Sequence, residues 1–521
     1  MEIDSTRHAP ADQYLQLLAD DRPMRVSLLA CSAALWLDDD VAMQAIRLAL
    51  PENDVTPELV SRVKRLGCVW RNWDGSWRLA EDVRAGLSDR LDTELPPDCV
   101  VRLRTRLASR AESRADGFSP DGQITNYRVR QACFEAAFQN VLIPGQTDQG
   151  AQQFANLWRS APPAARVATA SAADHLADEV GRRMKGVPPE LLFLRGMAAR
   201  DRGDRHGAER WFRQVWEQGK PGEIYAIASH LFGNMVRDRG IAERALLDAI
   251  EWGESGGHRG EVWHSLGNLL SRQPARWKEA EQAYDESLRL LHDPRDRGEV
   301  WHSVGNLLSR QPGRSREAEE AHHESLRLLR DPQDQGLVWH SLGNLLGRQP
   351  ARWKQAEEAY HESLRLLQHD PPGQGQVWHS LGNLLGRQSG RWKDAEEAYH
   401  ESLRLLQHDP PGQAQTYASW AAGLVNSGDR SSYSMAEAYA RRALSLNPEN
   451  PRHRSTVQGL LAKLYRASGR YPEAIEAIEA AMEADRTLKS WHLLKKREAD
   501  LEELRHLLQG GGPDPHDAPA E

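Results

Sequence analysis

Residues 263–291 read WHSLGNLLSRQPARWKEAEQAYDESLRLL, and the chain repeats this segment with few changes. The octet WHSLGNLL begins at Trp263, Trp339 and Trp378, and the variant WHSVGNLL begins at Trp301. Successive copies therefore start 38, 38 and 39 residues apart. A fixed period of this length indicates a repeat protein, in which each unit buries its apolar surface against its neighbours.

Each repeated unit predicts two helices. Trp263, Leu266, Gly267 and Leu270 recur at the i, i+3, i+4 and i+7 spacing that places them on one helix face. Residues 272–277 contain a proline and lack this period, and a second amphipathic run follows over residues 278–291. A hairpin of two helices cannot bury both of its apolar stripes alone, whereas stacked hairpins can. We therefore expect an all-α fold of the α-solenoid type.

The unit also resembles a known family, the tetratricopeptide repeat. The positions that carry this resemblance are Trp263, Leu266, Gly267, Ala280, Tyr284 and Pro294. The unit departs from the family at Leu270, where tyrosine is favoured, at Ser287, where alanine is favoured, and in its length, since about 34 residues is usual. The resemblance implies a superhelix that binds another protein, with Gly267 allowing a close helix approach.

Weaker copies extend the array in both directions and suggest its boundaries. We expect about eight repeats over residues 186–488, a capping helix over residues 489–508 and a disordered tail over residues 509–521. Residues 118–185 are expected to form a helical connector, and residues 1–20 a flexible N-terminus.

Residues 21–117 predict a small separate domain. Helical patterns over residues 24–37, 41–50 and 56–66 precede an alternating segment around Asp74-Gly75, a strong hairpin signal, and a further helix over residues 81–91. This order resembles a winged-helix domain. With the repeats that follow, it resembles the winged-helix part of bacterial signal-transducing ATPases with numerous domains. The chain has no GxxxxGK[ST] segment, so the nucleotide-binding domain of those ATPases is absent.

Two roles are open for this winged-helix-like domain. The third helix offers Arg62, Lys64 and Arg65, so residues 56–79 could contact nucleic acid. Acidic residues outnumber basic ones over residues 1–117, however, and Asp38, Asp39 and Asp40 lie close by in the sequence. We therefore favour a domain that packs against protein.

A polar stripe in the repeats is the predicted peptide-binding site. His264, Asn268 and Arg272 are spaced i, i+4 and i+8, and so share a face turned away from the apolar one. The equivalent residues are His230, Asn234, His302, Asn306, Arg310, His340, Asn344, Arg348, His379, Asn383 and Arg387. By the family resemblance, this stripe lines a concave groove and donates hydrogen bonds to a peptide with acidic groups. The alternative is that duplication copied the stripe without selection for binding.

The histidines of the stripe add a pH dependence to this prediction. The ordinary histidine pKa is near 6.5, so an acidic ligand is expected to bind more tightly as the pH falls from about 7.5 to 6. Because these histidines are about one repeat apart and no HxxxH or HExxH pair occurs on one helix, we expect no metal site.

The remaining chemistry of the chain argues against an enzyme. Cys31, Cys68, Cys99 and Cys133 form no CxxC pair and are expected to be buried thiols. No catalytic pair of carboxylates is found, and no cofactor is expected.

The bulk properties complete the sequence-based prediction. A net charge of -8 over 521 residues argues against a chain built mainly to coat nucleic acid, and no apolar run is long enough to cross a membrane. We expect a cytoplasmic adaptor, scaffold or sensor that binds a protein or peptide, in a bacterial defence or regulatory system. The alternative is a transcription regulator whose winged helix binds DNA while its repeats sense a peptide.

Overall fold

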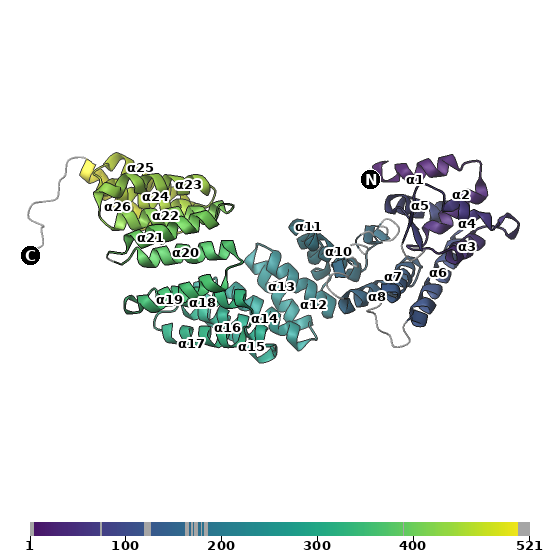
Figure 1. Ribbon diagram of the computed structural model, residues 1–521, viewed down its shortest axis with the longest axis horizontal. Coiled ribbons are helices and arrows are strands. Elements are labelled where there is room, and N and C mark those ends of the chain that lie inside the picture. The colour runs from purple at the N-terminus through teal and green to yellow at the C-terminus, as the bar shows by residue number, and fades with distance from the viewer. Residues whose placement is uncertain are drawn as a thin grey trace, which may run out of the picture. The chain divides into compact units, whose positions relative to one another are not determined.

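The computed structural model describes residues 5–72, 76–118, 127–161, 166–167, 170, 174, 176–178, 180–181, 186–388 and 390–508. The chain divides into two compact units, residues 1–269 and 270–521. Helices account for nearly all of the regular structure and follow one another in consecutive pairs, as the element labels of Figure 1 show. The fold is an all-α, solenoid-type repeat array.

The first unit begins with short helices and one small sheet. Its N-terminal elements are α1 (Ser5–Leu17), α2 (Arg22–Ser32), α3 (Asp39–Ala49), the 3-10 helix Glu52–Asp54, α4 (Glu58–Val63), β1 (Val69–Arg71), β2 (Trp77–Leu79), α5 (Glu81–Glu94) and α6 (Pro97–Phe118). Strands β1 and β2 are antiparallel, with Trp70 opposite Arg78, and Leu37 forms an isolated bridge with Trp77. The order of three helices, a hairpin and a helix is the one expected from the sequence.

Residues 1–20 were expected to be flexible, but residues 5–17 form helix α1, because Ala11 and Leu15 bury their side chains in the core that α2 and α5 also line. The Asp74-Gly75 turn lies outside the described residues, as do the tail from residue 509 and parts of the predicted connector.

The rest of the first unit is helical. Its elements are α7 (Tyr127–Leu142), α8 (Thr147–Ser160), α10 (Pro189–Asp201), α11 (Arg205–Trp216), α12 (Glu223–Met235), α13 (Arg239–Trp252) and α14 (Gly256–Leu270). A buried carboxylate, Glu135 on α7, accepts hydrogen bonds from the backbone amides of Leu35 and Trp36 and from Gln139. Burial raises the pKa of Glu135 to about 7.

The second unit continues the helical pairs. Its elements are the 3-10 helix Pro274–Arg276, α15 (Trp277–Leu290), α16 (Pro294–Leu308), α17 (Ser315–Leu328), α18 (Pro332–Leu346), the 3-10 helix Pro350–Arg352, α19 (Trp353–Leu366), α20 (Pro371–Leu385), α21 (Trp392–Leu405), α22 (Pro410–Asn426), the 3-10 helix Arg430–Ser432, α23 (Tyr433–Leu446), α24 (Pro451–Ala467), α25 (Tyr471–Thr487) and α26 (Trp491–Leu508). We call the first member of each pair, such as α16, α18, α20, α22 and α24, a first helix.

The loops between repeats supply the N-caps of the first helices. Asp293 accepts hydrogen bonds from the backbone amides of Arg295 and Asp296, and Pro294 occupies the first turn of α16. The same Asp-Pro pair, or Asn-Pro at α24, begins α18, α20, α22 and α24. These pairs place each helix start at a fixed position, because the cap satisfies free amides and proline needs no amide partner there.

Small residues hold the two helices of a repeat close together. A Cβ on Gly343 would lie 2.6 Å from the ring of Tyr360, so the close approach expected for this glycine position is present in the second unit. The serine that departs from the family pattern is buried. The hydroxyls of Ser325 and Ser363 donate hydrogen bonds to the carbonyl oxygens of Gly298 and Gly336 at 2.7 Å. The hydroxyl thus replaces an apolar contact with a hydrogen bond between helices.

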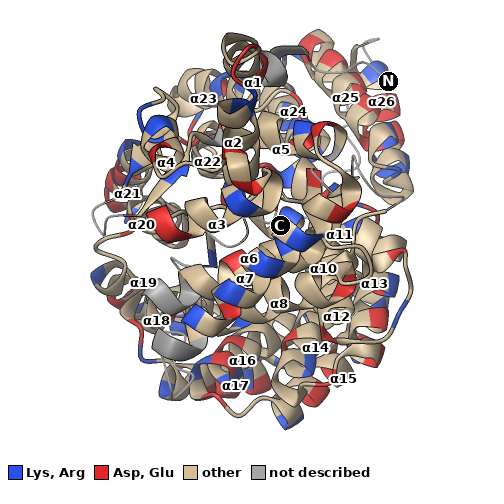
Figure 2. Ribbon diagram, turned by 90° about the vertical axis from the view of Figure 1, so that its right-hand side faces the viewer, with Lys and Arg blue, Asp and Glu red and all other residues tan. Residues whose placement is uncertain are grey.

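Arginines at the turns connect consecutive second helices, an arrangement we call the arginine ladder. Arg352 binds both carboxylate oxygens of Glu319 at 2.5 and 2.8 Å, and Arg314 and Arg391 bind Glu281 and Glu357 in the same way. Acidic and basic residues are both spread along α17, which belongs to this ladder (Figure 2). The ladder is a regular ionic link between stacked repeats.

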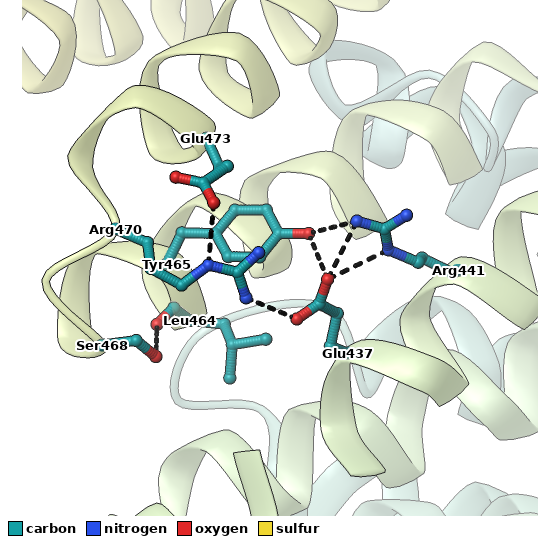
Figure 3. Close-up of polar contacts among 7 residues, drawn as sticks. All are labelled: Glu437, Arg441, Leu464, Tyr465, Ser468, Arg470 and Glu473. Carbon is teal, nitrogen blue, oxygen red and sulfur yellow. Dashed lines mark hydrogen bonds and ion pairs between the residues drawn. The ribbon is translucent and has the colours of Figure 1, made fainter. Parts of the chain in front are cut away.

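The last rung of the ladder is the most elaborate (Figure 3). Arg470 donates to Glu437 at 2.6 Å and to Glu473 at 2.9 Å, and its guanidinium lies over the Tyr465 ring at 4.5 Å. Glu437 also accepts from the Tyr465 hydroxyl and pairs with Arg441. Burial alone would raise the pKa of Glu437, but the bonds from Arg470 and Tyr465 outweigh it and lower that pKa.

Candidate functional site

The predicted histidine stripe connects neighbouring first helices. In the second unit, Nε2 of His302 lies 2.8 Å from Oγ of Ser341, and His340 and His379 make the same contact with Ser380 and Ser419. In the first unit, His230 reaches Ser265 at 2.9 Å. Each of these histidines therefore bonds to the serine of the next first helix, and the contact helps to stack the repeats.

The pH dependence predicted for this stripe is wrong. Burial lowers the pKa of His230, His264, His340 and His379 to about 4. The prediction assumed the ordinary value near 6.5, which applies to a ring in water. These rings stay neutral between pH 7.5 and 6, and so cannot add positive charge for an acidic ligand in that range.

The asparagines and arginines of the stripe lie in different surroundings. Oδ1 of Asn344 accepts a hydrogen bond from the Tyr360 hydroxyl at 2.9 Å, and Asn383 does the same with Tyr399. Arg272, Arg310, Arg348 and Arg387 are exposed, and Arg348 donates to the carbonyl of Ser309 at 2.9 Å. His230, Asn234, His264 and Asn268 belong to the first unit, and the later stripe residues to the second.

A cavity in the second unit extends this face beyond the predicted residues. Its volume is about 1200 Å³, and it is lined chiefly by the first helices α22 and α24 together with α26. From α20 it includes His379, which is the stripe residue that lines it. Apolar side chains such as Leu406, Val457, Leu460 and Leu493 contribute to its walls. A cavity of this size can hold several residues of an extended chain.

Some cavity residues of α22 and α24 stand at the helix positions that carry the stripe in earlier repeats, but they are of other residue types. Leu461 and Ala462 on α24 are buried as Leu342 and Gly343 are on α18, so Gly459 and Lys463 stand at the positions of His340 and Asn344. Ala418 and Ala422 occupy these positions on α22, and both line the cavity. The cavity therefore lies on the helix face of the stripe, but most of its lining residues come from helices beyond the predicted ones.

Basic side chains dominate the charge of the cavity. Five basic residues line it, Arg452, Lys463, Arg466, Lys496 and Arg497, against two acidic ones, Asp409 and Asp500. Arg466 pairs with Glu503, and Arg497 pairs with Asp485. Within residues 390–508, no ion pair engages Arg452, Lys463 or Lys496, so these three cations face the cavity without a carboxylate partner.

The basic residues considered for nucleic acid are largely engaged within the first unit. Arg62 on α4 pairs with Asp21, and Lys64 pairs with Asp39 at 2.8 Å. Arg65 donates to the carbonyl of Ser61. Asp38 and Asp40 pair with Arg114 and Arg110 on α6. Asp21 and Asp39 therefore neutralise two of these three basic residues, Arg62 and Lys64.

Among the described residues, no group of three or more His, Cys, Asp or Glu side chains is placed to hold a metal ion. Within that part, too, every helix is too short or too polar to cross a lipid bilayer. Cys31, Cys68 and Cys99 are buried thiols and Cys133 is half-buried; burial raises the pKa of Cys31 to about 12.

The fold is that of a helical repeat protein with a cavity lined by α20, α22, α24 and α26. Residues 262–298 and 459–490 match the family model of the tetratricopeptide repeat, so the chain contains tetratricopeptide repeats. The second match includes Gly459 and Lys463 of the cavity. No curated protein matches the chain.

Solved structures similar to this chain share little sequence with it. A signal-transduction ATPase with a tetratricopeptide repeat sensor from Pyrococcus horikoshii is 13% identical, with 97% of this chain and 68% of that one covered and a TM-score of 0.45. Yeast Tom70 is 13% identical over 98% and 97% of the two chains, with a TM-score of 0.45. BtubC from P. vanneervenii is 19% identical over 48% of this chain and 97% of that one, with a TM-score of 0.33.

Proposed function

We propose that this chain is a non-catalytic cytoplasmic adaptor or scaffold, and that it binds an acidic segment of a partner polypeptide in the cavity of α20, α22, α24 and α26. The observation that carries the proposal is the set of cavity cations without carboxylate partners, Arg452, Lys463 and Lys496. Apolar walls beside unpaired cations suit a peptide that alternates acidic and apolar side chains.

Selection from a random peptide library displayed on phage tests this proposal without assuming a partner. The full chain should select peptides enriched in aspartate and glutamate. Their affinity should fall at least tenfold in the double variant Lys463→Glu, Lys496→Glu, because two attractive charges become repulsive.

The matched control is the double variant Lys393→Glu, Lys495→Glu. Both of its lysines are exposed, neither lines the cavity, and its net charge equals that of the test variant. Binding should stay within twofold of the unmodified chain. Equal loss in both double variants, or selected peptides without excess acidic residues, would contradict the proposal.

DNA binding by the N-terminal domain is the alternative function. A salt-dependent shift of duplex DNA by the full chain, weakened by Arg65→Glu, would favour it. We expect no such shift at physiological salt, because Arg62 and Lys64 are already paired with aspartates.

A further inference from the structure

Arg497 on α26 is fixed from two sides. Its Nε donates to Oδ2 of Asp485 on α25 at 2.6 Å, and its Nη2 donates to the carbonyl and hydroxyl oxygens of Ser455 on α24 at 2.8 and 3.0 Å. Asp485 is completely buried and also accepts a hydrogen bond from the Ser455 hydroxyl at 2.6 Å. These bonds hold the guanidinium in one orientation, because a buried carboxylate left without its partners would be strongly destabilising.

The backbone of α24 is shaped to admit this guanidinium. Gly459 lies against the guanidinium, since a Cβ at this position would be 2.6 Å from Nη1 of Arg497. Gly459 stands where α16, α18 and α20 carry the stripe histidine and α22 carries Ala418. Because Gly459 has no side chain, Arg497 of α26 can occupy the space that a histidine would take.

One nitrogen of Arg497 is left for a ligand. The hydrogen bonds given above occupy Nε and Nη2, whereas Nη1 makes none among the described residues. Arg497 lines the cavity together with Lys463 and Lys496. The acidic residues of the lining are Asp409, which caps α22 through the Gly412 amide, and Asp500, one turn further along α26.

We infer that Arg497 is a carboxylate-binding residue of the cavity and that Asp485 is its positioning residue. This inference rests on the proposed function and names the chemical group that the site recognises, the side-chain carboxylate of an acidic peptide. A prepositioned arginine loses little conformational freedom when it binds, and its flat guanidinium suits a carboxylate better than a lysine does. Helix α26 therefore supplies a ligand-binding residue as well as capping the array.

The test compares two probes on three forms of the full chain. The probes are the acidic peptide selected most strongly in the library experiment and a copy in which every aspartate and glutamate is replaced by asparagine and glutamine. The forms are the unmodified chain, Gly459→Ala, and the double variant Asp485→Asn, Arg497→Gln, which removes both charges of the buried pair together. Affinities are measured by fluorescence anisotropy and folding by the thermal midpoint.

We expect the double variant to bind the acidic peptide at least tenfold more weakly and the amide copy as the unmodified chain does. Gly459→Ala keeps every charge and favours the helix, yet displaces Nη1, so it should weaken the acidic peptide about threefold or more. If the double variant does not fold, Gly459→Ala alone tests the role of Arg497. Unchanged affinity for the acidic peptide in the folded variants would overturn the role of Arg497 and leave the proposed function standing. Failure of the unmodified chain to select any acidic peptide would instead remove the proposed function and this inference together.

Discussion

His322 stands where the neighbouring second helices carry a tyrosine. The hydroxyls of Tyr360 and Tyr399 donate hydrogen bonds to Oδ1 of Asn344 and Asn383 in the same repeats. His322 is fully buried against Gly305, and among the described residues neither of its ring nitrogens has a hydrogen-bond partner. Burial lowers its pKa to about 3, so the ring is neutral. The histidine at this position thus leaves its repeat without the tyrosine–asparagine hydrogen bond that the next two repeats possess.

Replacing His322 by tyrosine should stabilise the array. The hydroxyl would reach Asn306 as it reaches Asn344 one repeat later, and it would remove unsatisfied buried nitrogens, for a gain of about 1 kcal/mol. Chemical denaturation of the His322→Tyr variant measures this gain. The reverse change, Tyr360→His, is the control and should cost a similar amount; equal stability of the two variants would contradict the account.

At the scale of single elements, much of the repeat could be predicted from sequence and part could not. The period, the helix pairs and the face that carries the stripe follow from the spacing of Trp263, Leu266 and Gly267. The burial of the stripe histidines could not be predicted, because it depends on the serine of the next repeat. The position of Arg497 could not be predicted for a similar reason, since its partners Asp485 and Ser455 come from helices that meet only in the folded unit.

The arginine ladder is also an element-scale feature, and one rung is missing among the described second helices from α15 to α25. Ser432 occupies the ladder position between α21 and α23, so Glu396 on α21 has no arginine of the kind that Glu357 has in Arg391. Ser432→Arg should raise the unfolding free energy by roughly 0.5 kcal/mol, as exposed ion pairs do. Arg352→Ala, which breaks an existing bidentate pair, should lower it by about 1 kcal/mol. Loss of stability in Ser432→Arg would show that the gap is not a missing rung.

For the whole molecule, the buried histidines predict sensitivity to mild acid. Five of them, His230, His264, His322, His340 and His379, have a pKa of about 3 or 4 in the folded chain. In the unfolded chain they would bind protons near pH 6.5, so the unfolded state gains more protons as the pH falls. Stability is therefore fully present above about pH 6.5 and is lost progressively toward pH 4. Glu135, with its pKa raised to about 7, acts in the opposite direction as a single group.

Thermal midpoints recorded at pH 7.5, 6.5, 5.5 and 4.5 measure this effect. We expect little change between the first two and a clear fall below pH 6.5. Peptide affinity should be flat between pH 7.5 and 6.5, because the stripe histidines remain neutral there. A midpoint that rises below pH 6.5 would mean that these rings are not buried as described.

The proposed function requires that a polypeptide bind in the cavity lined by α20, α22, α24 and α26. Hydrogen–deuterium exchange of the full chain, with and without the acidic peptide selected from the library, tests this most directly. We predict slower exchange in α22, α24 and α26 when the peptide is present, with α16 and α18 unchanged. Protection confined to α16 and α18, or to the N-terminal domain, would contradict it.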